Sequence, residues 1–247
     1  MLSELRRFSN AKIFCLLLVA LSGCSFIGPK SKNWDAAGSS SEHVAIPNPA
    51  SSAGRAAAET SQKLELAIAI ETADLARKRG MDDEAIAQYL VARKLDPKLK
   101  GVAHPLAVLY DRAGKMDAAE REYQLAMSEQ GNNADLLSDY GYFLYSRGKL
   151  TEAEATLRSA IKQTPKHHQA TINLALVVGT QGHYDESQRL FTEAIGPAAA
   201  LHNIGMLKLR AGDQAGAVES LRGASSQDPS LTESREVLAK LNGNFNR

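Results

Sequence analysis

A pattern of apolar and small residues repeats at regular intervals along this chain, and each copy of the pattern begins with a glycine. A small residue follows each glycine after five positions, a large apolar or aromatic residue comes four later, and alanine comes three after that. The glycines are Gly80, Gly114, Gly148, Gly182 and Gly212; the small residues are Ala85, Ala119, Ala153, Ser187 and Ala217; the large residues are Tyr89, Tyr123, Leu157, Phe191 and Leu221; the alanines are Ala92, Ala126, Ala160, Ala194 and Ala224. The spacing between glycines is 34 residues, except for the last interval of 30. Periods of this size are typical of repeat architectures.

The spacing predicts pairs of α-helices. The glycine suits the left-handed residue that ends a first helix, and the small residue lets a second helix approach the first closely. The large residue and the alanine lie on one face of that second helix. Pro97, Pro165 and Pro229 then stop second helices. Pro105 and Pro197 interrupt the pattern, and we expect each in the first turn of a helix.

This helix-turn-helix pattern resembles the tetratricopeptide repeat family over about residues 66–229. Tyr140-Gly141 and Ile204-Gly205 fill the Leu-Gly slot of the family's first helix. The resemblance implies an all-α, right-handed superhelical solenoid of about five helix pairs, with the first helices lining its concave face. The segment LTESREVLAKLN after Pro229 resembles the capping helix that such arrays need. We therefore expect the solenoid and its cap to occupy residues 59–243.

The N-terminus has the pattern of an export signal. A basic stretch is followed by an apolar run at residues 13–21 and by Ser22, Gly23 and Cys24. A nine-residue helix spans roughly 14 Å, whereas the hydrocarbon core of a bilayer is about 30 Å thick. The run is therefore too short for a transmembrane helix, and residues 1–23 are predicted to be a signal peptide.

Residues 21–24, Leu-Ser-Gly-Cys, resemble the lipobox of bacterial lipoproteins. The resemblance implies cleavage before Cys24 and acylation of its sulfur, which anchors the protein in a membrane. An ordinary secretory signal with a chance cysteine is the alternative. Ser25 resembles the outer-membrane sorting position, so we expect the periplasmic face of the outer membrane. Residues 24–58 are rich in Ser, Gly and Pro and predict a disordered, flexible linker.

Composition and charge exclude several function classes. The formal net charge is +1, which does not indicate a nucleic-acid partner. The two cysteines, Cys15 and Cys24, lie near the N-terminus, so no cysteine-based metal site or disulfide can form downstream. The chain lacks phosphate-binding, zinc-protease and nucleophile-elbow motifs. We therefore expect no enzyme activity, no cofactor, no metal and no small-molecule substrate.

The resemblance also implies that a protein or peptide partner lies against the first helices. Tyr142 and Tyr145 are rigid amphipathic rings of the kind favoured at recognition surfaces, and Asn173 and Asn203 are placed to bond a peptide backbone. The alternative is that several such residues fill space between helices. The predicted groove residues are Arg112, Tyr142, Tyr145, Asn173, Leu176, His202, Asn203 and Met206, with His104, Val108, Asp135, Ser138, Asp139, Gln169, Ile172 and Leu209 as further candidates.

A lipid-anchored repeat array is similar in size and layout to the tight-adherence (Flp) pilus-assembly lipoproteins and the type IV pilus pilotins. The similarity implies a membrane-anchored scaffold that helps to assemble an envelope machine, such as a pilus or a secretion system. Two alternatives remain open from the sequence. The protein is an adaptor that recruits a cell-wall enzyme or protease to the membrane, or it associates with itself through exposed repeat ends.

Overall fold

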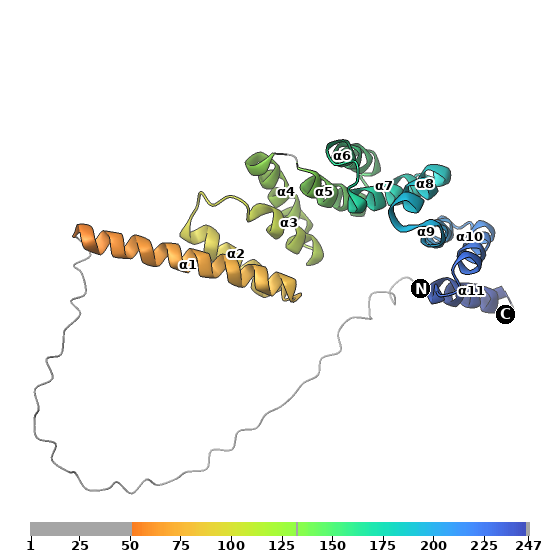
Figure 1. Cartoon of the computed structure of the whole chain (residues 1–247), viewed down its shortest axis with the longest axis horizontal. Helices are drawn as coiled ribbons and strands as arrows, with labels where there is room; N and C mark the ends of the chain where they lie inside the picture. Colours follow the sequence, from red (N-terminus) through yellow and green to blue (C-terminus); the bar gives the residue numbers. More distant parts are fainter. Residues whose placement is uncertain (1–50, 132, 246–247) are drawn as a thin grey trace, which may run out of the picture. The chain divides into compact units, whose positions relative to one another are not determined.

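The computed structural model describes residues 51–131 and 133–245, and all regular secondary structure in this part of the chain is α-helical (Figure 1). The helices are α1 (Ser52–Lys78), α2 (Asp82–Leu95), α3 (Ala103–Arg112), α4 (Met116–Gln130), α5 (Ala134–Ser146), α6 (Leu150–Gln163), α7 (His168–Thr180), α8 (Tyr184–Ile195), α9 (Pro197–Arg210), α10 (Gln214–Gln227) and α11 (Thr232–Phe245). The all-α prediction is confirmed. The signal peptide, the lipidated Cys24 and most of the linker lie outside the described residues.

The helices pack in sequence order, as in a solenoid. The pairs α1–α2, α3–α4, α5–α6, α7–α8 and α9–α10 correspond to the five predicted repeats, and each pair packs against the next. The first helices also contact one another across pairs, as α3 does with α5, α5 with α7, and α7 with α9. α11 packs on α10 as the expected capping helix. One side of the array is therefore built mainly by first helices.

The first helix begins earlier than the sequence predicted. α1 starts at Ser52, whereas the predicted flexible linker extended to residue 58. Ser51 caps the helix by accepting a 3.0 Å hydrogen bond from the Gly54 amide on its Oγ. Alanines at positions 53 and 56–58 have the highest helix propensity and sustain the first turns. No helix in the described part of the chain has the length and apolar character needed to cross a membrane.

The repeat glycines adopt the predicted left-handed conformation. At Gly148 φ is +74°, the Lys149 amide donates to the Leu144 carbonyl at 3.0 Å, and the Gly148 amide donates to the Tyr145 carbonyl at 2.9 Å. These two bonds form a Schellman motif, which satisfies carbonyls that the end of α5 would otherwise leave unpaired. The equivalent glycines, which also have positive φ, are Gly80, Gly114, Gly182 and Gly212.

The seam inside each helix pair is built as predicted from small residues. A Cβ added to Gly141 of α5 would lie 2.5 Å from Leu157 Cγ of α6, so only glycine permits this approach. Gly205 of α9 and Leu221 of α10 repeat the arrangement, with a 2.7 Å separation. In all five pairs the small residue five positions after the repeat glycine is 0% exposed, and the core extends along the array as a series of clusters, each shared by neighbouring helices.

Candidate binding groove

Two adjoining cavities lie along the side of the array that the first helices build. One, of about 300 Å³, is lined from α1, α3 and α5, and the other, of about 370 Å³, is lined mainly from α3, α5 and α7. They share Val108, Arg112 and Asp139 and so form one groove. Predicted groove residues that line it are His104, Val108, Arg112, Asp139, Tyr142, Gln169, Ile172, Asn173 and Leu176.

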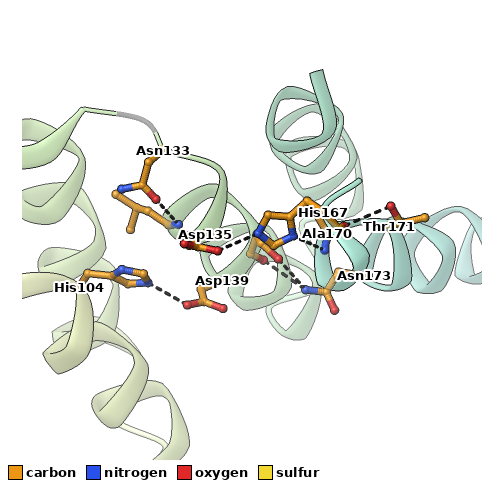
Figure 2. Close-up of polar contacts among 10 residues, drawn as sticks. His104, Asn133, Asp135, Asp139, His167, Ala170, Thr171 and Asn173 are labelled. Atoms are coloured by element: carbon orange, nitrogen blue, oxygen red, sulfur yellow. Dashed lines mark hydrogen bonds and ion pairs between the residues drawn. The ribbon is translucent and has the colours of Figure 1, made fainter. Parts of the chain in front are cut away.

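Two histidine–aspartate contacts join successive repeats at the edge of this groove (Figure 2). His104 Nε2 of α3 lies 2.8 Å from Asp139 Oδ2 of α5, and His167 Nε2, just before α7, lies 2.9 Å from Asp135 Oδ1 of α5. His167 Nδ1 accepts a 3.0 Å hydrogen bond from the Ala170 amide, so the neutral ring carries its proton on Nε2 and donates it to Asp135. These contacts fix the stacking of the first helices.

Asn173 is buried and its amide is engaged within the array. Its side chain is 4% exposed, and Nδ2 donates at 3.3 Å to both the carbonyl and the hydroxyl of Ser138 on α5. Gln169 Nε2 donates to Asn173 Oδ1 at 3.0 Å. Asn173 therefore joins α7 to α5. That this amide also bonds a partner's backbone stays a prediction, and any such bond must share groups that are already paired.

Tyr142 and Tyr145 have different surroundings although their rings lie 5.9 Å apart. The Tyr145 hydroxyl accepts hydrogen bonds from Arg210 Nη1 of α9 at 2.9 Å and from Thr180 Oγ1 of α7 at 3.3 Å. Tyr145 thus links three first helices. Tyr142 is 44% exposed and lines the larger cavity, so it is the aromatic ring that the groove presents to solvent.

The predicted groove residues of the fifth repeat do not line either of these two cavities. His202 Nδ1 lies 2.8 Å from Ser234 Oγ on the capping helix, and Asn203 Nδ2 donates to the Ala199 carbonyl at 2.9 Å. Met206 is 39% exposed. His202 thus attaches the cap to α9, and Asn203 bonds the backbone of its own helix. A contact between any of the three and a partner stays a prediction.

The interior of the larger cavity is acidic. It contains Asp111 of α3 and Asp139 of α5, whereas Arg112, its cation, contacts Asp82 of α2. Burial raises the pKa of Asp111 above its usual value, and the charge of Asp139 raises it further. Burial likewise raises the pKa of Tyr123, with smaller contributions from Asp139 and Asp111. The cavity therefore favours cationic or hydrogen-bond-donating groups.

Asp111 and Tyr123 were not among the groove residues predicted from the sequence. Tyr123 occupies the large packing position of the second helix, which gave no reason to expect it at the groove. Asp111 had a usable signal, because it lies three residues after Val108 and so shares its helical face. Whether Tyr123 reaches the groove depends on how α3, α4 and α5 pack together. The spacing of residues within one helix does not predict that packing.

Comparisons with known proteins agree with the repeat architecture. Residues 102–167 match the family model described as YpiA-like, C-terminal tetratricopeptide repeats. The type IV pilus assembly protein PilF of Pseudomonas aeruginosa is 30% identical over 102 residues. That match spans 40% of this chain and 40% of PilF, so it concerns less than half of either protein.

Solved structures with the same fold include PilW, described as a widely conserved type IV pilus biogenesis factor. It has a TM-score of 0.58 and 21% identity, over 72% of this chain and 86% of PilW. YrrB, described as a TPR protein with an unusual peptide-binding site, has a TM-score of 0.55 and 19% identity, over 76% of this chain and 97% of YrrB. At these identities the likeness concerns the fold.

Proposed function

We propose that this chain, a tetratricopeptide-repeat protein by its repeat pattern and its fold, is a lipid-anchored scaffold that binds polypeptide and helps to assemble an envelope machine such as a pilus or a secretion system. The observation that carries the proposal is the groove along α1, α3, α5 and α7. Protein-binding surfaces are enriched in exposed aromatic rings, and Tyr142 provides one there. Recognition, without catalysis or a cofactor, is the whole of its activity.

The partial similarity to PilF and the shared fold with PilW support the choice of an envelope machine. The fold alone supports only recognition of polypeptide, because one scaffold serves many functions. The repeat array supplies the binding surface, and the acylated Cys24 supplies the attachment to the periplasmic face of the outer membrane. Residues 24–51, up to the beginning of α1 at Ser52, serve as the tether between them.

Site-specific photo-crosslinking in cells tests the groove. A benzoylphenylalanine in place of Tyr142 reacts with whatever occupies the groove, whereas the same probe at Leu125 on α4, which is 38% exposed, is the matched control on a second helix. We expect an adduct with a pilus or secretion component from position 142 and none from position 125. An adduct with a cell-wall enzyme or a protease would instead support the adaptor role, and no adduct from position 142 would refute groove binding.

The anchor is tested separately with a clickable fatty acid. We expect labelling of the wild-type chain and of the Cys15→Ala variant, because Cys15 lies within the predicted signal. Cys24→Ala is expected to remain unlabelled and to leave the outer-membrane fraction. Equal labelling of Cys24→Ala and wild type would contradict the anchor while leaving groove binding intact.

A further inference from the structure

The first and second repeats each bury a tyrosine at the same position, but only the tyrosine of the first repeat has a hydrogen-bond partner for its hydroxyl. Tyr89 and Tyr123 hold equivalent positions, 34 residues apart. In the first repeat Tyr89 donates a 2.5 Å hydrogen bond to Asp74 Oδ1. The residue equivalent to Asp74 in the second repeat is Val108, which has no acceptor. The hydroxyl of Tyr123 therefore lacks the partner that its counterpart has.

The Tyr123 hydroxyl is directed toward the larger cavity of the groove. The residue is 1% exposed and lines that cavity together with Asp111 and Asp139. Within residues 51–131 and 133–245 no hydrogen-bond partner for this hydroxyl is present. The oxygen is not sealed off from solvent either, so it remains accessible from the cavity that Tyr123 lines. Buried hydroxyls are normally paired, so one left open toward a cavity points to a partner from outside.

Three oxygen sites thus surround one recess, which we call the Tyr123 recess and define by Tyr123, Asp111 and Asp139. His104 occupies Oδ2 of Asp139, which leaves the other carboxylate oxygen available. Arg112 is already paired with Asp82 and does not neutralise the recess. Val108 and Tyr142 provide apolar walls beside these oxygens. An apolar stem with a compact cationic head, which carries three donors, fits this arrangement.

We propose that the Tyr123 recess holds the ammonium group of a lysine side chain from the polypeptide bound in the groove. Two carboxylates and one hydroxyl match the three donors of an ammonium, whereas the planar guanidinium of arginine suits a bidentate acceptor. The side chain's butyl stem lies between Val108 and Tyr142. This inference rests on the proposed function, because it names the chemistry by which the groove selects its partner.

Selection of a phage-displayed random peptide library on the full chain tests the proposal. Selected peptides are expected to share one lysine, and replacing that lysine by isosteric norleucine or by arginine is expected to lower affinity about tenfold or more, since a charged hydrogen bond is worth about 1.5–3 kcal/mol. Peptides that bind without a shared lysine would overturn the lysine recess and leave groove binding intact. If no peptide is selected, both proposals fail.

Three variants of the chain identify the recess. Asp111→Asn is expected to weaken the selected peptide about tenfold, and Tyr123→Phe about threefold to tenfold. Asp117→Asn, at an exposed aspartate of α4 that lines neither cavity, removes the same charge and is expected to change affinity less than twofold. Equal weakening by Asp111→Asn and Asp117→Asn would show that only the general charge of the protein matters and would overturn the recess. Unchanged thermal unfolding of each variant excludes a folding defect as the cause.

Discussion

The seam within each helix pair and the groove between pairs use the repeat in opposite ways. Five residues after each repeat glycine, the seam position holds only Ala or Ser, and all five side chains are 0% exposed. Six residues before each glycine, the equivalent first-helix position differs in every repeat: it is Asp74, Val108, Tyr142, Leu176 and Met206 in turn, and Val108, Tyr142 and Leu176 line the groove. The same kind of residue thus recurs five times at the seam position, whereas the first-helix position holds a different residue in each repeat.

The difference has a physical cause. A seam position must satisfy the close approach of two helices, and that distance is the same in every pair, so the same small volume is needed each time. A groove position faces a cavity or solvent and has few packing requirements, so its chemistry is free to vary. We therefore expect seam changes to alter stability and groove changes to alter binding.

Removing the large seam residue of the third repeat is expected to have the largest effect on stability. Leu157 is 0% exposed and packs on Gly141. Leu157→Ala leaves a cavity and should lower the free energy of unfolding by about 2–5 kcal/mol, measured by chemical denaturation. The control Leu125→Ala, at a leucine that is 38% exposed, should cost less than about 1 kcal/mol. Similar losses in both variants would contradict the assignment of the seam.

Adding one carbon on the other side of the same seam is expected to cost somewhat less. Gly141→Ala places a Cβ against Leu157 and should lower the free energy of unfolding by about 1–3 kcal/mol through overpacking. In the double variant Gly141→Ala with Leu157→Ala the added methyl occupies the vacated space. The combined loss should therefore be smaller than the sum of the single losses by about 1 kcal/mol or more. Strict additivity would show that the two residues do not meet.

A third change separates the conformational role of glycine from its packing role. Nothing lies within 4 Å of a Cβ built on Gly148, but its φ of +74° is unfavourable for other residues. Gly148→Ala should lower the free energy of unfolding by about 1 kcal/mol, measured as above. Gly148→Asn should cost less, because asparagine tolerates the left-handed region. If the two variants lose equal stability, backbone conformation is not the cause.

The contrast between seam and groove also explains what the sequence predicted well. The helix pairs, the glycine caps and the closed seam follow from positions that recur five times, so each repeat confirms the others. Pro105 and Pro197 were correctly expected in first turns, since α3 begins at Ala103 and α9 begins at Pro197. The start of α1 was missed because its Ala-rich turns and the Ser51 cap stand outside the repeat.

Groove residues were harder to predict because one side chain can either face a partner or bind a neighbouring helix. The sequence placed both Asn173 and Tyr142 on a first helix, yet Asn173 is 4% exposed and bonded to Ser138, whereas Tyr142 is 44% exposed. That distinction depends on the stacking of α5 against α7. The missing partner of Tyr123 can be recognised by comparing Asp74 in the first repeat with the equivalent Val108 in the second. That comparison has a meaning only once the hydrogen bond from Tyr89 to Asp74 is known.

The smallest expected effect on stability comes from a change at the border between seam and groove. Tyr123→Phe keeps the buried ring and removes a hydroxyl that has no hydrogen-bond partner in the described residues, so the free energy of unfolding should change by less than about 0.5 kcal/mol or rise slightly. The equivalent Tyr89→Phe removes the bond to Asp74 and should lower it by about 1–2 kcal/mol. Chemical denaturation of the two variants side by side checks the difference. A loss in Tyr123→Phe as large as that in Tyr89→Phe would mean that the chain itself satisfies the Tyr123 hydroxyl, and the recess would then offer a partner only the carboxylate oxygens of Asp111 and Asp139.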